Sequence, residues 1–241
     1  MSDVKNSSLA TDLVSYWELE EASGTRFDSH GANDLTDNNT VGQATGKIGN
    51  GADFEDGNSE SLSDVNTGQY TSTVGSFACW VKVENLKTSD FSPSIVSTIR
   101  SNADDTGGMV MRYSFVDQKV NWFKGNSVGG YTASTTALTS GSWFHIVGTW
   151  DSSEIKIYVN GTLEGTNSSV SASTTAGNLT IGSDTVNTAR RFDGVIDEVG
   201  FWSKVLTSTE VSDLYNSGAG IPYDAGGPAV PTARRGAVMM M

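Results

Sequence analysis

The fold follows from one stretch of sequence, Arg191-Phe192-Asp193-Gly194-Val195-Ile196-Asp197-Glu198-Val199-Gly200-Phe201-Trp202. Apolar residues fall on both sides of its alternation: Val195, Val199 and Phe201 on one side, Phe192, Ile196 and Trp202 on the other. A strand that is apolar on both faces lies inside a sheet, so we expect a central strand here. Asp197 shares its side with Val195 and Val199, and its buried carboxylate would need a hydrogen-bond donor or a metal, because an unpaired buried polar group is costly.

Short apolar runs separated by Gly, Ser, Thr, Asn and Asp recur along the chain. The runs predict strands over residues 13–19, 52–54, 76–83, 94–100, 109–115, 119–123, 143–150, 155–159 and 179–181. Asn160-Gly161 predicts a two-residue hairpin turn, which needs positive φ at both positions. A chain of 241 residues with this pattern favours one all-β domain, a sandwich or a barrel.

One helix is expected, close to the C-terminal end of the domain. Thr207-Ser208-Thr209-Glu210 is a capping box, with Thr207 as the N-cap. Val211, Leu214 and Tyr215 share one face of the helix that follows, and Gly218 is expected to end it.

Charge and cysteine content exclude several classes of protein. The formal net charge is −13, so partners with a phosphate backbone or an anionic membrane surface are not expected, whereas calcium is compatible with the surplus carboxylates. Cys79 is the single cysteine, so no internal disulfide forms, and its apolar strand predicts a buried thiol without catalytic function.

The two ends of the chain differ from its middle. Residues 1–12 are interpreted as a polar arm without a secretion signal, so synthesis in a cytoplasm is expected, and no apolar run is long enough to span a membrane. Residues 13–220 form the predicted domain. The Gly-, Ala- and Pro-rich residues 221–241 are predicted to dock onto a neighbouring chain through Arg234, Arg235, Val238, Met239 and Met240.

Five motifs occur in a fixed order between residues 12 and 218. They are Trp17 with Glu20/Glu21, Ser23-Gly24, Asp28, Gly31 and Asn33-Asp34; Gly141–Val147; Ile157–Gly161; Phe192–Val199; and Leu206–Tyr215. In this order and spacing the sequence resembles the laminin-G-like, concanavalin-A-like jelly-roll family. The resemblance implies two antiparallel sheets packed face to face, with the first and last strands adjacent and one short C-terminal helix.

The resemblance also implies a structural calcium ion (Ca²⁺) between the loop after the first strand and the last strand. By position, its ligands would be Asp28, backbone oxygens near Gly31 and Asn33, and Asp197. The alternative is that Asp28 caps a turn and that Asp197 accepts backbone N–H bonds.

Catalysis is not expected. Glycosidases on related jelly rolls carry carboxylates at close spacing on one face of a strand, whereas Asp197 and Glu198 are consecutive and should face opposite ways. His145 is expected to satisfy a buried hydrogen bond, and His30 to lie in a solvated turn. A glycoside hydrolase is therefore a distant alternative.

Glycan binding is the favoured activity, because sugars are held by an aromatic platform with fixed polar partners. The candidates near predicted loops are Trp122, Tyr131 and Tyr113, with Asp104, Asp105, Asn121 and Asn126.

The domain type also resembles modules of phage capsid decorations and tail fibres. We therefore expect a display or attachment protein on a virion surface, made in the host cytoplasm, with virion proteins and glycans as partners. A purely structural decoration protein and an extracellular adhesin are the alternatives, and the oligomeric state stays open.

Overall fold

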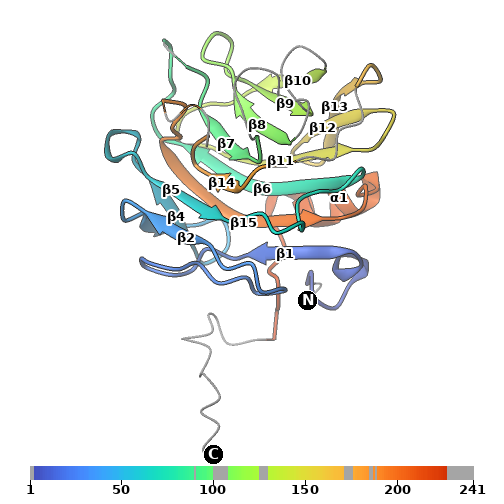
Figure 1. Ribbon diagram of the computed structural model, residues 1–241, viewed down its shortest axis with the longest axis horizontal. Helices are drawn as coiled ribbons and strands as arrows, with labels where there is room; N and C mark the ends of the chain where they lie inside the picture. Colours follow the sequence, from blue (N-terminus) through green and yellow to red (C-terminus); the bar gives the residue numbers. More distant parts are fainter. Residues whose placement is uncertain are drawn as a thin grey trace, which may run out of the picture.

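The computed structural model describes residues 3–89, 91–99, 108–124, 130–170, 176–184, 187 and 189–226. Two antiparallel sheets pack face to face, and one short helix lies near the C-terminal end of the described chain (Figure 1). The predicted all-β jelly-roll sandwich is therefore confirmed.

The eight-stranded sheet carries most of the long strands. Its order is β13 (Thr162–Asn167), β12 (Ile155–Val159), β11 (Trp143–Trp150), β6 (Gly75–Val83), β15 (Gly194–Trp202), β4 (Asn50–Phe54) and β3 (Gly42–Thr45), and β1 (Leu13–Trp17) also pairs with β15. Thus β15 is central and adjacent to β1, as the sequence predicts.

The seven-stranded sheet covers the inner face of the first sheet. Its order is β10 (Tyr131–Ala137), β9 (Lys119–Lys124), β8 (Met109–Tyr113), β7 (Ser94–Ser97), β14 (Leu179–Ile181), β5 (Ser61–Asp64) and β2 (Thr36–Asn38). In Figure 1 this sheet runs from β10 at the top to β2 at the lower left.

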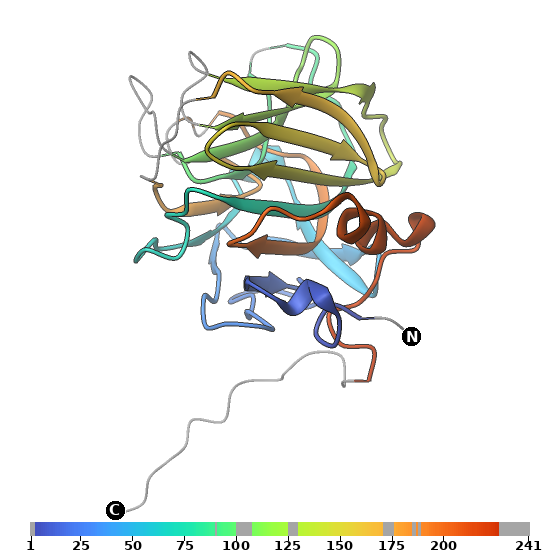
Figure 2. The same cartoon turned by 90° about the vertical axis from the view of Figure 1, so that its right-hand side faces the viewer.

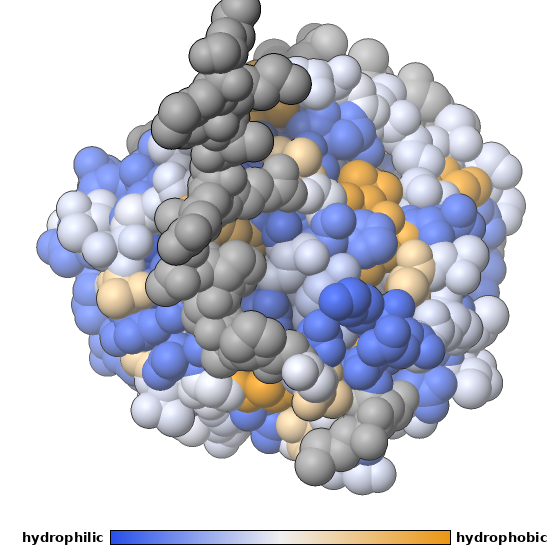
Figure 3. All heavy atoms as spheres, turned by 90° about the horizontal axis from the view of Figure 1, so that it is seen from below, coloured by the Kyte–Doolittle hydropathy of each residue, from blue (hydrophilic) through white to orange (hydrophobic). Residues whose placement is uncertain are grey.

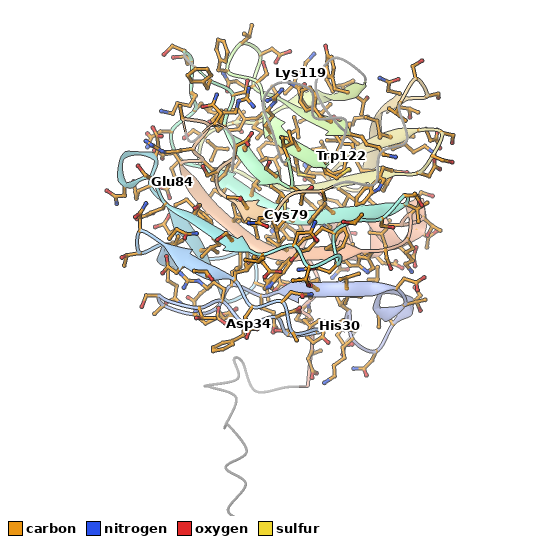
Figure 4. All side chains as sticks on the ribbon, viewed as in Figure 1. His30, Asp34, Cys79, Glu84, Lys119 and Trp122 are labelled. Carbon is orange, nitrogen blue, oxygen red and sulfur yellow. The ribbon has the colours of Figure 1, made fainter. Side chains whose placement is uncertain are left out.

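The core fills the space between the sheets with large aromatic side chains. The rings of Phe77 and Phe201 have centroids 4.7 Å apart, and Trp122 and Trp150 pack beside them. Only glycine fits at position 148, because a Cβ atom added there would lie 2.5 Å from the Trp122 ring. Cys79 and Trp122 are visible inside the body in Figure 4, and burial raises the pKa of the Cys79 thiol to about 12.

A second apolar cluster covers the outer face of the eight-stranded sheet. Helix α1 (Ser208–Tyr215), which lies beside this sheet in Figure 2, contributes Val211 and Leu214. The capping box of Thr207 and Glu210 is formed as predicted, but Asn216 in the left-handed conformation ends the helix instead of Gly218. Within the described segments, the remaining helical turns are the 3₁₀ turns η1 (Ser8–Ala10), η2 (Asp56–Asn58) and η3 (Asn216–Gly218).

Both described chain ends join this outer cluster. Val4 and Leu9 of the predicted arm and Ile221 and Tyr223 of the predicted tail are buried in it. The amide of Val4 donates to the Pro222 carbonyl at 3.1 Å, so the segments pair with one another. The visible surface on the side of β1 carries mainly hydrophilic residues, in keeping with the charge of the chain (Figure 3).

The strict alternation expected for β15 is wrong beyond Asp197. The pairing register with β6 shifts between Asp197 and Gly200, and Glu198 has a φ of +51°. This β-bulge places Ile196, Val199 and Phe201 together in the core, whereas the sequence pattern separates Ile196 from the other two.

Among the described residues, no helix is long and apolar enough to cross a membrane.

Candidate functional site

The outer face of the seven-stranded sheet carries two rows of side chains that the strand registers define. One row runs through Thr36, Ser63, Thr180, Ser97, Val110, Phe123 and Tyr131. On β7, β8 and β9, a parallel row contains Ser94, Arg112 and Asn121. Residues directly opposite in an antiparallel pair point to the same face, and Met111 and Trp122 face the core, so these rows face outward.

The end of this face formed by β2, β5 and β14 is a polar groove. Its volume is about 470 Å³, and it is lined by Asn38, Asn39, Ser59, Ser61, Ser63, Thr180, Ser183, Asp184 and Arg191. Amides, hydroxyls, one carboxylate and one guanidinium offer donors and acceptors in the mixture that a polyhydroxylated ligand requires.

Two buried hydroxyls belong to this face and have no hydrogen-bond partner within the described part of the chain. They are Thr180 Oγ1 in the groove and Ser94 Oγ on the neighbouring strand β7. Thr180 is 4% exposed and Ser94 is fully buried. An unpaired buried hydroxyl costs free energy, so a ligand that pairs with it gains that free energy on binding.

The opposite end of the face is aromatic. The Phe123 and Tyr131 rings stack with centroids 5.1 Å apart, and the Arg112 guanidinium lies 4.1 Å from the Phe123 centroid. Tyr131 is 51% exposed, whereas Phe123 is buried beneath its two neighbours. The Tyr131 ring is therefore an accessible flat surface beside a row of polar side chains.

The structure corrects two of the residues expected to bind a glycan. Trp122 and Tyr113 are fully buried in the core, because each lies at an inward position of its strand. A sugar cannot reach either ring. Tyr131 is exposed, and Asn121 lies in the outward row. Asp104, Asp105 and Asn126 lie outside the described residues.

Sequence reasoning missed Arg112, Ser94 and the serine and threonine positions of β5 and β14. A signal was present at Arg112, because it is the one charged residue of an otherwise apolar run, Met109–Tyr113. The groove itself joins β2, β5 and β14, which are far apart in sequence, and no local pattern indicates that they meet.

The Asp28 carboxylate does not act as expected of a metal ligand. It accepts hydrogen bonds from the backbone amides of Tyr16, His30, Gly31 and Asn33 at 2.8–3.1 Å. These four donors surround the carboxylate, so the expected contributions of Gly31 and Asn33 are N–H groups rather than carbonyl oxygens. His30 and Asp34 lie in the same loop, at the lower edge of the molecule in Figure 4.

The Asp197 carboxylate binds a different segment. It accepts from the amides of Lys47 and Ile48 at 2.7 Å and 3.0 Å, and from Glu198 at 2.9 Å. Asp28 and Asp197 share no hydrogen-bond donor, and both carboxylates are satisfied by amides that repel a cation. The four residues Asp28, Gly31, Asn33 and Asp197 therefore do not fit calcium, and the alternative in which both acids accept backbone N–H bonds describes the geometry.

Another acidic group meets the geometric condition for holding a cation. One ligand atom each from Asp53, Glu55 and Glu84 lies within 4.8 Å of the others. Burial raises the pKa values of Asp53 and Glu55, and the neighbouring carboxylate of Asp193 raises them further. Calcium binding itself stays a prediction, since acidic groups of this kind also occur on protein surfaces without an ion.

The groups considered for catalysis are enclosed. The bulge turns Glu198 to the same side as Asp197, against expectation, and the Glu198 side chain pairs with Tyr16. The His145 ring packs at a tilt against Trp80, and its Nδ1 has no partner among the described residues, so the expected buried hydrogen bond is absent there. Burial lowers the pKa of His145 to about 3. Asp197, Glu198 and His145 are each at most 4% exposed.

These features define a class: a jelly-roll sandwich with an open polar groove and an aromatic edge on one sheet. The sequence matches the family described as the concanavalin A-like lectin/glucanases superfamily over residues 50–212. The chain belongs to this family. No curated protein matches it by sequence.

Solved structures share the fold at low sequence identity. The binding domain of Paraclostridial Mosquitocidal Protein 1 superposes with a TM-score of 0.67 at 19% identity, covering 87% of this chain and 53% of that one. Domain 4 of AbnA, a GH43 extracellular arabinanase from Geobacillus stearothermophilus in complex with arabinotriose, gives 0.61 at 21% identity, with 84% and 97% covered. Trypanosoma rangeli sialidase gives 0.67 at 15% identity, with 88% and 34% covered. The chain thus spans about half of the toxin chain and a third of the sialidase chain.

Proposed function

We propose that this protein is a non-catalytic glycan-binding module and that the outer face of the seven-stranded sheet binds the glycan. The observation that carries the proposal is the buried, unpartnered hydroxyl of Thr180 in the polar groove, in an outward row of side chains that ends at Tyr131. The AbnA domain with the same fold is bound to arabinotriose, which supports a sugar ligand for this fold.

A glycan array probed with the purified protein tests this proposal, followed by titration with the strongest hit. Tyr131→Ala is expected to weaken binding roughly 2- to 10-fold, since aromatic stacking contributes about 0.5–1.5 kcal/mol. Leu163→Ala is the matched control, because Leu163 is 47% exposed on β13 of the other sheet. An array without signal above background would favour a purely structural decoration protein.

The absence of catalysis is part of the proposal. Asp197 and Glu198, the consecutive acids of β15, are buried within the eight-stranded sheet and do not line the groove. Incubation of the protein with its array hit should leave the glycan intact by mass spectrometry. Release of shorter oligosaccharides would contradict a binding-only role.

We further propose that the module is displayed on a phage particle and attaches it to surface glycans. The acidic composition and the resemblance to capsid decorations and tail fibres support this setting, and the tail with Arg234, Arg235, Val238, Met239 and Met240 would dock on other virion proteins. Purified particles should contain the protein. A variant lacking residues 227–241 should fold but dissociate from particles, and retention of that variant would contradict tail docking.

A further inference from the structure

Three arginines gather with one carboxylate on the described part of the proposed glycan-binding face, although the chain carries a net charge of −13. Arg191 lines the groove, Arg190 forms an ion pair with Asp184 at 3.2 Å, and Arg112 lies in the outward row next to Ser94. The single carboxylate of Asp184 therefore lies among three guanidinium groups, those of Arg112, Arg190 and Arg191. A local excess of positive charge on an acidic protein selects the sign of the ligand.

Arg112 is the informative residue of the three. It makes no ion pair or hydrogen bond with any described residue; its guanidinium instead lies on the Phe123 ring. Burial lowers the pKa of Arg112 to about 10, and repulsion from Arg190 contributes, so the side chain is still a cation at neutral pH. The nearby Asp184 carboxylate partly offsets these two effects, but its ion pair is with Arg190, so Arg112 can still gain an anionic partner.

The environment of Ser94 adds hydrogen-bond donors at the same place. Ser94 lies directly opposite Arg112 in the strand pair, and its amide donates to the Arg190 carbonyl at 3.0 Å. The backbones of both arginines therefore flank a fully buried hydroxyl that has no partner in the described chain. Guanidinium groups bind carboxylate and sulfate oxygens through charge-assisted hydrogen bonds, and Ser94 brings the strands of two of them together at this place.

We infer that the preferred glycan is acidic and that its carboxylate or sulfate group binds to Arg112, with Arg190 beside it. This inference rests on the proposed function and names the ligand class of the same face. The neutral remainder of the glycan would occupy the groove toward Asn38 and Ser61 and the platform at Tyr131.

The test is an array that contains neutral, carboxylated and sulfated glycans, followed by titration of the strongest acidic hit and its uncharged parent. The acidic form should bind at least tenfold more tightly than its uncharged parent, because charge-assisted hydrogen bonds are stronger than hydrogen bonds between neutral groups. Binding should weaken as salt is raised. The carboxylated and sulfated members decide which anion is preferred.

Variants locate the effect. Arg112→Gln should lower the affinity for the acidic hit about tenfold or more, and by a clearly larger factor than the affinity for the uncharged parent, whereas Arg112→Lys should restore part of the loss. Lys156→Gln on β12 of the other sheet removes the same charge elsewhere and should have no effect. Thermal melts confirm that each variant is folded.

The outcomes separate the two proposals. Equal binding of acidic and neutral glycans, or an Arg112→Gln variant that binds the acidic hit like the original protein, overturns the acidic preference and leaves glycan binding intact. Failure to bind any glycan overturns both.

Discussion

The backbone conformation of one residue, Glu198, changes which side chains β15 directs to each face of the sheet. Its left-handed backbone conformation inserts a bulge, so two consecutive acids turn to one side of β15. The Asp197 carboxylate is held by three amides, whereas Glu198 Oε2 has no partner among the described residues. Burial, reinforced by repulsion from Asp197, raises the pKa of Glu198 well above its ordinary value, and we infer that Glu198 holds a proton at neutral pH.

Glu198→Gln should therefore preserve the fold and change its pH dependence. An acid whose pKa is raised by folding stabilises the native state most below its unfolded pKa of about 4.3 and loses that contribution as pH rises toward the folded value. The original protein should lose stability from about pH 4.3 upward through this group, and the glutamine variant should not. Urea unfolding across pH measures the difference.

The matched control is Glu154→Gln, which removes one carboxylate from a partly exposed position before β12. Parallel stability curves for the Glu198→Gln variant and the original protein would show that Glu198 is ionised in the folded state.

At the scale of elements, the short helix α1 depends on its first turn. Thr207 accepts from the Glu210 amide at 3.2 Å, and Glu210 accepts from the Thr207 amide at 2.9 Å. The helix has only 8 residues, too few to be stable without its cap and its packing on the sheet.

Thr207→Ala should destabilise the domain by about 1 kcal/mol, the usual contribution of an N-cap side chain. Thr209→Ala is the control at an exposed position two residues on, where alanine favours the helix. Chemical denaturation measures both, and equal stability of the two variants would mean that packing alone holds the helix.

The turns and strands of the secondary structure were predicted from the sequence more accurately than the contacts of single residues. The Asn160-Gly161 turn has φ values of +50° and +78° as predicted, and the strand at residues 179–181 has the predicted bounds. Such features depend on local backbone preference, which neighbouring residues determine. The strand of Tyr131–Ala137 was not predicted, because its run of Thr, Ser and Ala has no apolar alternation.

At the scale of the whole molecule, the chain ends are part of the folded body. The Tyr223 ring stacks on Tyr16 with centroids 5.4 Å apart, and the Lys5 amide donates to the Tyr223 carbonyl at 2.9 Å. The boundary of the domain therefore lies beyond the residue 220 that composition indicates.

Deletion of residues 221–241 should lower the free energy of unfolding by roughly 3 kcal/mol or more, because it removes the burial of Ile221 and Tyr223. Deletion of residues 227–241 keeps those contacts and is the control. Thermal melts of the two truncated proteins should differ by several degrees. Equal melting temperatures would show that residues 221–226 contribute little.

The sequence by itself determined the sandwich, the central place of β15, the capped helix and the burial of Cys79 and Asp197. The sandwich follows from the resemblance carried by five motifs in fixed order, and the other features follow from periodicity or from a local motif. Tertiary structure alone decided the partners of Asp28 and Asp197, the side that Glu198 faces, the burial of Trp122 and the grouping of Arg112, Arg190 and Ser94. Those outcomes depend on strand register and on register shifts such as those in β15 and β7, which bring together residues far apart in the chain and are not encoded in any one stretch.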